Sequence, residues 1–169
     1  DIHTIYKNGA KEIAALEGMS ITFMAKYDER EGNSCHIHLS LRTDEDSPVF
    51  ADDNAVFESF LAGQLATLRE LTLFLAPNIN SYKRYQPGSW APTAIGWGMD
   101  NRTLGFRVVG HGQGMRVESR VPGADCNPYL ALAATIAGGL HGIEHRIEPP
   151  QAYVGNGYES DLPRIPHTL

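Results

Sequence analysis

The chain has 169 residues, a length that fits one compact domain. Hydrophobic residues make up 42% of it and charged residues 20%, average globular proportions that exclude a disordered tail and a collagen-like repeat. The net charge of −6 gives no general attraction to nucleic acid or to an anionic membrane, so we expect neither as a partner.

The longest nearly apolar run, residues 130–140, is shorter than the roughly 20 residues that a membrane span needs. Cys35 and Cys126 have neither disulfide-framework nor zinc-type spacing, so we expect a reducing compartment, the cytoplasm. The chain starts at Asp1 with a helical pattern already running, so we expect a fragment of a longer protein.

The first half of the chain predicts two helices and two strands. Apolar residues at helical spacing predict a helix over residues 1 to about 17, ending before Gly18. Residues 20–26 read as a strand, and the strict alternation of residues 35–42 predicts a second one. A stripe of Phe and Leu side chains over residues 54–76 predicts the long core helix.

The second half predicts a sheet followed by a helix. Residues 78–92 read as an irregular connection, and 94–99, 102–109 and 114–121 as three strands separated by glycines. Asn127 and Pro128 form an N-cap and N1 pair that opens a helix running to Ile143, and the tail after Pro149 reads as loop. We therefore expect an α+β fold, with an antiparallel-rich sheet and long flanking helices.

The strand predicted over residues 35–42 has two different faces. Side chains of alternate residues point to the same side, so Cys35, Ile37, Leu39 and Leu41 share one face and His36, His38, Ser40 and Arg42 the other. The polar face could simply be solvated. Two histidines at this spacing also suit metal ligation, which makes the polar face a candidate site.

The strand predicted over residues 114–121 repeats this pattern with charged residues. Arg116, Glu118 and Arg120 share one face, as expected either for an exposed ladder of ion pairs or for a binding site. Context favours the site, because the window from Arg84 to Arg120 holds five arginines and only two acids, Asp100 and Glu118. Arginine forks suit carboxylates and phosphates better than lysines do.

The histidine strand, the lone carboxylate and the arginines together describe a site for a divalent metal, a polyphosphate and a carboxylate, as phosphoryl transfer requires. Neither a Walker A motif nor a Gly-x-Gly-x-x-Gly loop is present, so arginines and metal would hold the phosphates. Arg102 and Arg107 would converge only if a bulge at Gly105 turned one of them, which the sequence leaves open.

From about Asp1 to Pro166 the chain resembles the central and C-terminal part of the glutamine synthetase catalytic domain. The resemblance implies one domain piece over residues 1–169, of the glutamine synthetase and guanido kinase type, without the family's N-terminal β domain and extreme C-terminus. It rests on these ordered motifs: Ile-Tyr-Lys at 5–7, Thr-Phe-Met-Ala-Lys at 22–26, the Gly32–Ser40 run with its two histidines, Asn-Ser-Tyr-Lys-Arg at 80–84, Asn-Arg at 101–102, Arg107, Arg-Val-Glu-Ser-Arg at 116–120 and Asn-Pro-Tyr-Leu at 127–130.

The resemblance implies a ligase that uses ATP and Mg²⁺ or Mn²⁺ to join the γ-carboxylate of glutamate to ammonia or a primary amine through a γ-glutamyl phosphate. The implied roles are metal binding by His36 and Glu118, ATP binding by His38, Ser40, Arg107 and Arg116, glutamate binding by Gly32, Arg84 and Arg120, and contact of Arg102 with the transferred phosphoryl group. Arg84 and Arg102 are the expected catalytic residues.

The sequence departs from the family pattern at two substrate-side positions. Glu31 replaces an asparagine in the loop before the first histidine, where it would repel a carboxylate unless it is paired or points away. Trp90 stands where the family's flap has a glutamate that attracts ammonium. An indole cannot ionise, but it can contact an alkylamine by apolar and cation–π attraction, so we expect an amine other than ammonia.

Three other interpretations remain open: a true glutamine synthetase in which Trp90 only packs, a non-catalytic scaffold or sensor of the same fold, and a guanidino-kinase-like phosphotransferase. The family's remaining metal-binding glutamates would lie upstream of Asp1, and a ring-shaped homo-oligomer would complete the site. We therefore expect residues 1–169 alone to be inactive.

Overall fold

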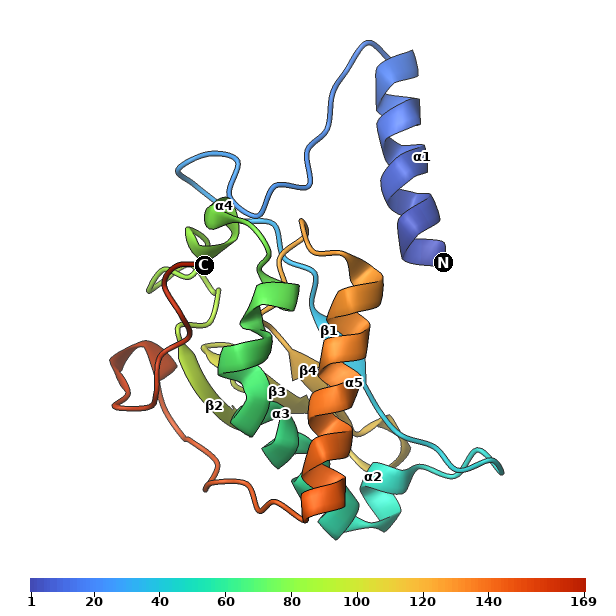
Figure 1. Cartoon of the computed structure of the whole chain (residues 1–169), viewed down its shortest axis with the longest axis vertical. Coiled ribbons are helices and arrows are strands. Elements are labelled where there is room, and N and C mark those ends of the chain that lie inside the picture. Colours follow the sequence, from blue (N-terminus) through green and yellow to red (C-terminus); the bar gives the residue numbers. More distant parts are fainter.

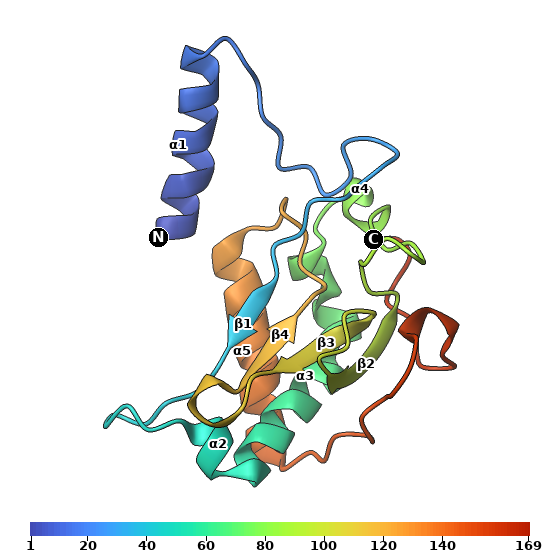
Figure 2. The ribbon, with the colours of Figure 1, turned by 180° about the vertical axis from the view of Figure 1, so that it is seen from behind.

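The computed structural model describes residues 1–169 and has the expected α+β architecture. A four-stranded sheet with the order β1-β4-β3-β2 is covered on one face by the two long helices α3 (Asn54–Leu75) and α5 (Pro128–His145) (Figure 1). The opposite face of the sheet is turned toward the viewer in Figure 2.

Strand pairing places the predicted polar faces side by side. β1 (Ile37–Leu39) runs antiparallel to β4 (Arg116–Ser119), and β4 runs antiparallel to β3 (Leu104–Val109). β2 (Ala94–Met99) pairs with β3 in parallel. Two of the three pairings are therefore antiparallel, as expected. The register shifts between Ala94 and Trp97, so the irregularity lies on β2 and not at Gly105.

The long helices begin where the sequence predicts, because side chains cap them. Asp53 Oδ1 accepts a hydrogen bond from the Val56 N–H at 3.1 Å at the start of α3. Asn127 Oδ1 accepts from the Tyr129 N–H at 3.0 Å at the start of α5. Caps of this kind satisfy backbone donors that have no partner inside the helix.

Glycines let α3 and α5 approach each other closely. A Cβ atom built on Gly63 would lie 2.2 Å from the Gly138 carbonyl oxygen, and one on Gly142 would lie 1.9 Å from the Ser59 carbonyl oxygen. The buried side of α5 therefore consists of small residues: Ala131, Ala134, Thr135, Gly138, Gly139 and Gly142. The larger Leu130 and Leu140, which continue the helical pattern of the sequence, are about half exposed.

The strand predicted over residues 94–99 is confirmed as β2, three other strands are shorter than predicted, and one predicted strand is wrong. Residues 20–26 form no strand, because the backbone of this segment bonds to a side chain: the Lys26 N–H donates to Asn80 Oδ1 at 2.9 Å. The pattern over residues 35–42 shrinks to three paired residues, with isolated bridges at Ser34 and Arg42. Four short elements were not predicted: α2 (Val49–Asp52), α4 (Ile79–Tyr82), and the 3₁₀ turns η1 (Gly112–Gly114) and η2 (Gly157–Glu159).

Helix α1 (Ile2–Leu16) confirms the first predicted helix and stands apart from the sheet and the long helices (Figure 1). Of its residues only Ala14 is buried, and Ile2, Ile5, Ile13 and Leu16 are all largely exposed. Lys7 Nζ ties it to the body by donating to the Ala124 carbonyl oxygen at 2.5 Å. None of the helices has the length and hydropathy that a membrane span requires.

Candidate active site

Glu118 is the centre of the polar face. It lies in the middle of β4, directly opposite His38 on β1 and Arg107 on β3, so three strands bring their side chains into one row. The residues on either side, Val117 and Ser119, point into the core and are almost fully buried. Period-two alternation therefore sorts β4 into a core face and a site face, as the sequence predicts.

Four side chains surround the Glu118 carboxylate, whose side chain is only 3% exposed. Its Oε1 lies 3.0 Å from His36 Nδ1, 3.6 Å from His38 Nε2 and 2.9 Å from Arg120 Nη1. Its Oε2 accepts from Arg107 Nη1 at 3.0 Å. A buried carboxylate with this many donors is held in one orientation.

Burial by itself would raise the pKa of Glu118, but the hydrogen bond from His36 and the charges of Arg120 and Arg107 outweigh it and lower that pKa to about 2. The carboxylate is therefore ionised throughout the physiological pH range. The pKa of His38 is lowered, first by burial and then by the charge of Arg116, which exceed the opposing effect of Glu118. Neutral imidazole is the form that can accept a hydrogen bond or bind a metal.

Arg120 links the polar face to two loops. Besides Glu118, it donates from Nε to the Arg102 carbonyl oxygen and from Nη2 to the Trp90 carbonyl oxygen, both at 3.1 Å. Trp90 has a φ of 61°, a left-handed conformation that costs a bulky residue about 1–3 kcal/mol. The bond from Arg120 helps to hold this conformation, in which the indole is 63% exposed.

Arg84 is almost fully buried and contacts the backbone at Arg120. Its Nη2 donates to the Arg120 carbonyl oxygen at 3.4 Å and to that of Val121, while its Nε is buried without any hydrogen-bond partner. Burial lowers the pKa of Arg84. Gly32 packs against this side chain: a Cβ at Gly32 would lie 2.6 Å from Arg84 Cγ, so only glycine fits there without displacing the arginine.

The remaining predicted residues lie around this centre. Arg116 Nε donates to His38 Nδ1 at 3.2 Å, which joins two of the four predicted ATP contacts. Arg107 also binds Asp100, through Nε at 2.8 Å and through Nη2. Ser40, just beyond β1, is exposed and makes no side-chain hydrogen bond. Arg102 lies in the turn before β3 and lines a cavity of about 370 Å³ that it shares with Trp90 and Tyr153.

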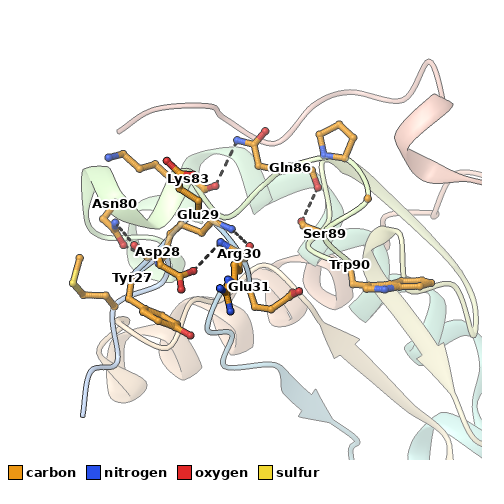
Figure 3. Close-up of a pocket in the computed structure, with 14 residues that line it drawn as sticks. Tyr27, Asp28, Glu29, Arg30, Glu31, Asn80, Lys83, Gln86, Ser89 and Trp90 are labelled. Carbon is orange, nitrogen blue, oxygen red and sulfur yellow. Dashed lines mark hydrogen bonds between the residues drawn. The ribbon is translucent and has the colours of Figure 1, made fainter. Parts of the chain in front are cut away.

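A larger polar cavity of about 880 Å³ is also lined by Trp90 (Figure 3). It is formed between the loop that follows the wrongly predicted strand and the irregular connection before β2. Its lining is Met24, Lys26, Tyr27, Asp28, Glu29, Arg30, Glu31, Asn80, Lys83, Gln86, Pro87, Gly88, Ser89 and Trp90. Glu31 and Trp90, the two departures from the family pattern, therefore share one cavity.

The donor set fits part of a divalent metal site. An imidazole nitrogen and a carboxylate oxygen 3.0 Å apart, on His36 and Glu118, are close enough to bind the same ion, and both suit Mn²⁺, while the carboxylate suits Mg²⁺. No group of three or more His, Cys, Asp or Glu side chains is arranged to hold a metal. The chain itself therefore offers a partial ligand set.

Sequence reasoning missed some residues that shape the site. In the sequence Asp100 is only an acid among arginines, yet in the structure it binds Arg107. Tyr85 donates its hydroxyl to the Val121 carbonyl oxygen at 2.8 Å, next to Arg84. Neither lies in a periodic pattern. The sequence offers one signal for them, which is that each lies close to an arginine of the predicted site. Tyr85 follows Arg84 directly, and Asp100 precedes Arg102 by two residues.

The domain thus combines a mixed sheet, two helices on one face of it and an arginine-rich polar cluster on the other, and arginine side chains are chemically suited to phosphates and carboxylates. Comparison with known families identifies it: the family described as glutamine synthetase, catalytic domain, matches residues 1–169. The chain belongs to the glutamine synthetase family.

Two curated relatives act on amines according to their names. A gamma-glutamylethanolamide synthetase of Streptomyces coelicolor is 59% identical over 172 residues, which cover 100% of this chain and 37% of the relative. A glutamate–isopropylamine ligase of a Pseudomonas species is 47% identical over 161 residues, covering 90% of this chain and 35% of the relative. The chain thus spans little more than a third of the length of these relatives.

Solved structures share the fold. A structure described as a GmaS/ADP complex superposes with a TM-score of 0.90 at 34% identity, covering 98% of this chain and 42% of the other. An apo GmaS structure without ligand gives a TM-score of 0.88 at 32% identity, with 98% and 40% covered. The expected fold class is therefore confirmed.

Proposed function

We propose that the protein carrying these residues is an ATP-dependent ligase that joins the γ-carboxylate of glutamate to a primary amine. In the first step the terminal phosphoryl group of ATP passes to the glutamate γ-carboxylate and gives γ-glutamyl phosphate and ADP. In the second step the ammonium form of the amine loses a proton to water and its nitrogen lone pair attacks the acyl carbon. The carbon–oxygen bond to phosphate breaks, phosphate leaves, and the nitrogen loses a second proton, to the departing phosphate or to water, to give the amide.

The observation that carries the choice of an amine over ammonia is Trp90. Its exposed indole borders the 880 Å³ cavity six residues after Arg84, where the family pattern has a glutamate. An aromatic face attracts an alkylammonium ion by cation–π and apolar contact worth about 0.5–2 kcal/mol. Both relatives described above are named for amine substrates, which supports the same choice.

The polar face is suited to the phosphate end of the reaction. We assign nucleotide contacts to His38, Ser40, Arg107 and Arg116, and metal binding to His36 and Glu118. Bound Mg²⁺ or Mn²⁺ would screen the negative charge of the phosphate oxygens. Arg102 has an exposed side chain with no protein partner, which leaves its N–H groups free to stabilise charge on the transferred phosphoryl group.

Arg84, Arg120 and Gly32 are assigned to glutamate. Arg84 uses Nη2 for backbone carbonyls, so Nη1 is left for a carboxylate. Arg120 spends three of its five N–H donors on Glu118, Arg102 and Trp90, and two remain. Gly32 lies against Arg84, and the absence of a side chain there lets the arginine pack against the backbone of this loop.

We further propose that residues 1–169 are the central and C-terminal part of a larger catalytic domain, in a cytoplasmic, ring-shaped homo-oligomer. The incomplete metal-ligand set, the apolar residues exposed on α1 and α5 and the partial coverage of the relatives support this assignment. In such an assembly, other residues would complete the site.

The test is a set of initial rates with the full-length protein, glutamate, ATP and Mg²⁺ or Mn²⁺, comparing ammonium with ethanolamine, isopropylamine and putrescine. We expect amide formation, with phosphate release, at a kcat/KM at least ten-fold higher for one of the amines than for ammonium. A clear preference for ammonium would establish glutamine synthesis instead. A phosphorylated product without an amide would favour a phosphotransferase, and failure of ATP to raise the Tm would favour a scaffold.

A further inference from the structure

Several charged side chains line the cavity beside Trp90, and the proposed function assigns no role to them. Three carboxylates, Asp28, Glu29 and Glu31, line it together with Lys26, Arg30 and Lys83. If the proposed function holds, one of these groups recognises the amine.

The loop that carries the carboxylates is fixed at both ends. The Asn33 N–H donates to the Ala25 carbonyl oxygen at 2.8 Å and closes the loop. Asn80 clamps its start, since the Lys26 N–H donates to Asn80 Oδ1 at 2.9 Å and Asn80 Nδ2 donates back to the Lys26 carbonyl oxygen at 2.7 Å. The loop is therefore held in place opposite Trp90.

The three carboxylates are not equivalent. Asp28 Oδ1 accepts the Arg30 N–H at 2.7 Å and is thus used within the loop itself. Glu29 and Glu31 take part in no hydrogen bond or ion pair within the chain. Figure 3 shows that the Glu31 side chain extends toward the Trp90 indole. Glu31 is therefore the carboxylate on the tryptophan side of the cavity, and it has no ion-pair partner there.

The backbone next to Glu31 touches the proposed glutamate site. Gly32 follows it directly and packs against Arg84. A carboxylate at this junction opposes a second carboxylate but favours a cation, so Glu31 is poorly suited to bind the glutamate and well suited to bind a protonated amine. The tryptophan offers an apolar and π-electron surface to the carbon chain of the same molecule.

We propose that Glu31 binds the ammonium group of the amine substrate, a protonated primary alkylamine whose carbon chain contacts Trp90. Glu31 thus supplies from the opposite loop the negative charge that is missing at position 90. This makes Glu31 a specificity-determining residue for the amine and not for glutamate or ATP.

The test uses the full-length enzyme and the variant Glu31→Gln, which keeps the shape of the side chain and removes its charge. With ethanolamine as the probe, we expect KM to rise at least ten-fold, because hydrogen bonds to charged groups are the strong ones. KM for glutamate and for ATP should stay within two-fold, and so should kcat at saturating ethanolamine. Hydroxylamine, an amine that is uncharged at neutral pH, should react equally well with the variant and the wild type.

Two further variants separate a local contact from general charge. Glu31→Asp keeps the charge and should retain most of the affinity for ethanolamine. Glu45→Gln removes one negative charge from an exposed turn outside the cavity and should change nothing. An equal rise in KM for Glu29→Gln would overturn the assignment, because it would indicate a diffuse field instead of one contact.

The assignment is also overturned if Glu31→Gln leaves KM for ethanolamine unchanged, raises KM for glutamate, or impairs hydroxylamine as strongly. These results arise in an enzyme that still makes amides from amines, so they leave the proposed function intact. If the wild-type enzyme uses only ammonium, the proposed function and the assignment of Glu31 are both wrong.

Discussion

Glu118 is a buried carboxylate between two arginines, and its charge should matter for stability as well as for catalysis. Glu118→Gln keeps the shape but leaves Arg107 and the buried Arg120 without their shared counter-charge. Removing one partner of a buried ion pair costs about 3–5 kcal/mol. We expect a fall in unfolding free energy of this order in urea melts of the full-length protein. Glu58→Gln is the matched control: this half-buried residue of α3 accepts one hydrogen bond, from Asn54 Nδ2, which an amide oxygen can also accept, so the change should cost less than about 0.5 kcal/mol.

The lowered pKa of Glu118 predicts an acid-sensitive contribution to stability. Its pKa falls from an ordinary 4.5 to about 2 in the folded protein, so the folded state binds this proton less tightly than the unfolded state. The contribution, about 3 kcal/mol, is fully present above pH 4.5 and is lost as the pH falls toward 2. Thermal melts between these pH values should show a shallower decline for Glu118→Gln than for the wild type. Parallel curves would contradict this prediction.

Trp90→Glu tests the position that distinguishes amine from ammonium. The substitution restores a carboxylate where the family pattern has one and removes the aromatic surface. The cation–π contribution of about 0.5–2 kcal/mol corresponds to a loss in kcat/KM for ethanolamine of about 2- to 30-fold, while kcat/KM for ammonium should rise. Trp90→Phe keeps an aromatic ring and should retain most of the amine preference. The prediction fails if both variants lose ethanolamine and ammonium activity alike.

The sequence could predict the part of the site that lies on strands. Alternation assigned Arg116, Glu118 and Arg120 to one face because side chains on a strand point to opposite sides in turn, whatever the strand's length. The cavity between Glu31 and Trp90 comes from two loops that are more than 50 residues apart in the sequence. Loops have no period, so only the departures from the family pattern marked these two positions.

Among the elements, helices were predicted better than strands. A helix satisfies its backbone within itself, so its periodicity and caps are local, and α3 and α5 begin within a residue of the predicted starts. A strand exists only where another strand pairs with it. Residues 20–26 have strand-like composition, but Lys26 pairs with Asn80 on α4, so no ladder forms.

The close packing of α3 on α5 predicts which glycine substitutions lower the stability of the protein. Gly142→Ala places a Cβ within 2 Å of the Ser59 carbonyl oxygen, and backbone atoms of both helices must move apart. Overpacking of this kind costs about 1–3 kcal/mol or more. Gly9→Ala in α1 is the control: its Cβ would meet nothing within 4 Å, and alanine is the better helix former. We expect Gly142→Ala to lower the Tm by several degrees and Gly9→Ala to leave it equal or slightly raised. Equal Tm values for the two variants would contradict the close packing.

At the scale of the whole molecule, the set of metal ligands is incomplete. Strand pairing holds the Glu118 cluster, and hydrogen bonds at both ends hold the loop that carries Glu31. The metal-ligating groups are only His36 and Glu118, and the apolar faces of α1 and α5 are uncovered. In the assembly proposed above, other residues would supply the ligands that these two lack.

Residues 1–169 expressed alone should consequently show no ligase turnover, even where circular dichroism shows the helices formed. With glutamate, ATP, Mn²⁺ and ethanolamine, phosphate release by the isolated chain should equal the rate without protein, because two ligands hold a divalent ion too weakly to position the phosphates. The full-length protein at the same concentration is the positive control. Turnover by the isolated chain within a hundred-fold of the full-length rate would show that the cluster around Glu118 is catalytically sufficient, and the assignment of further metal ligands to the rest of the protein would be wrong.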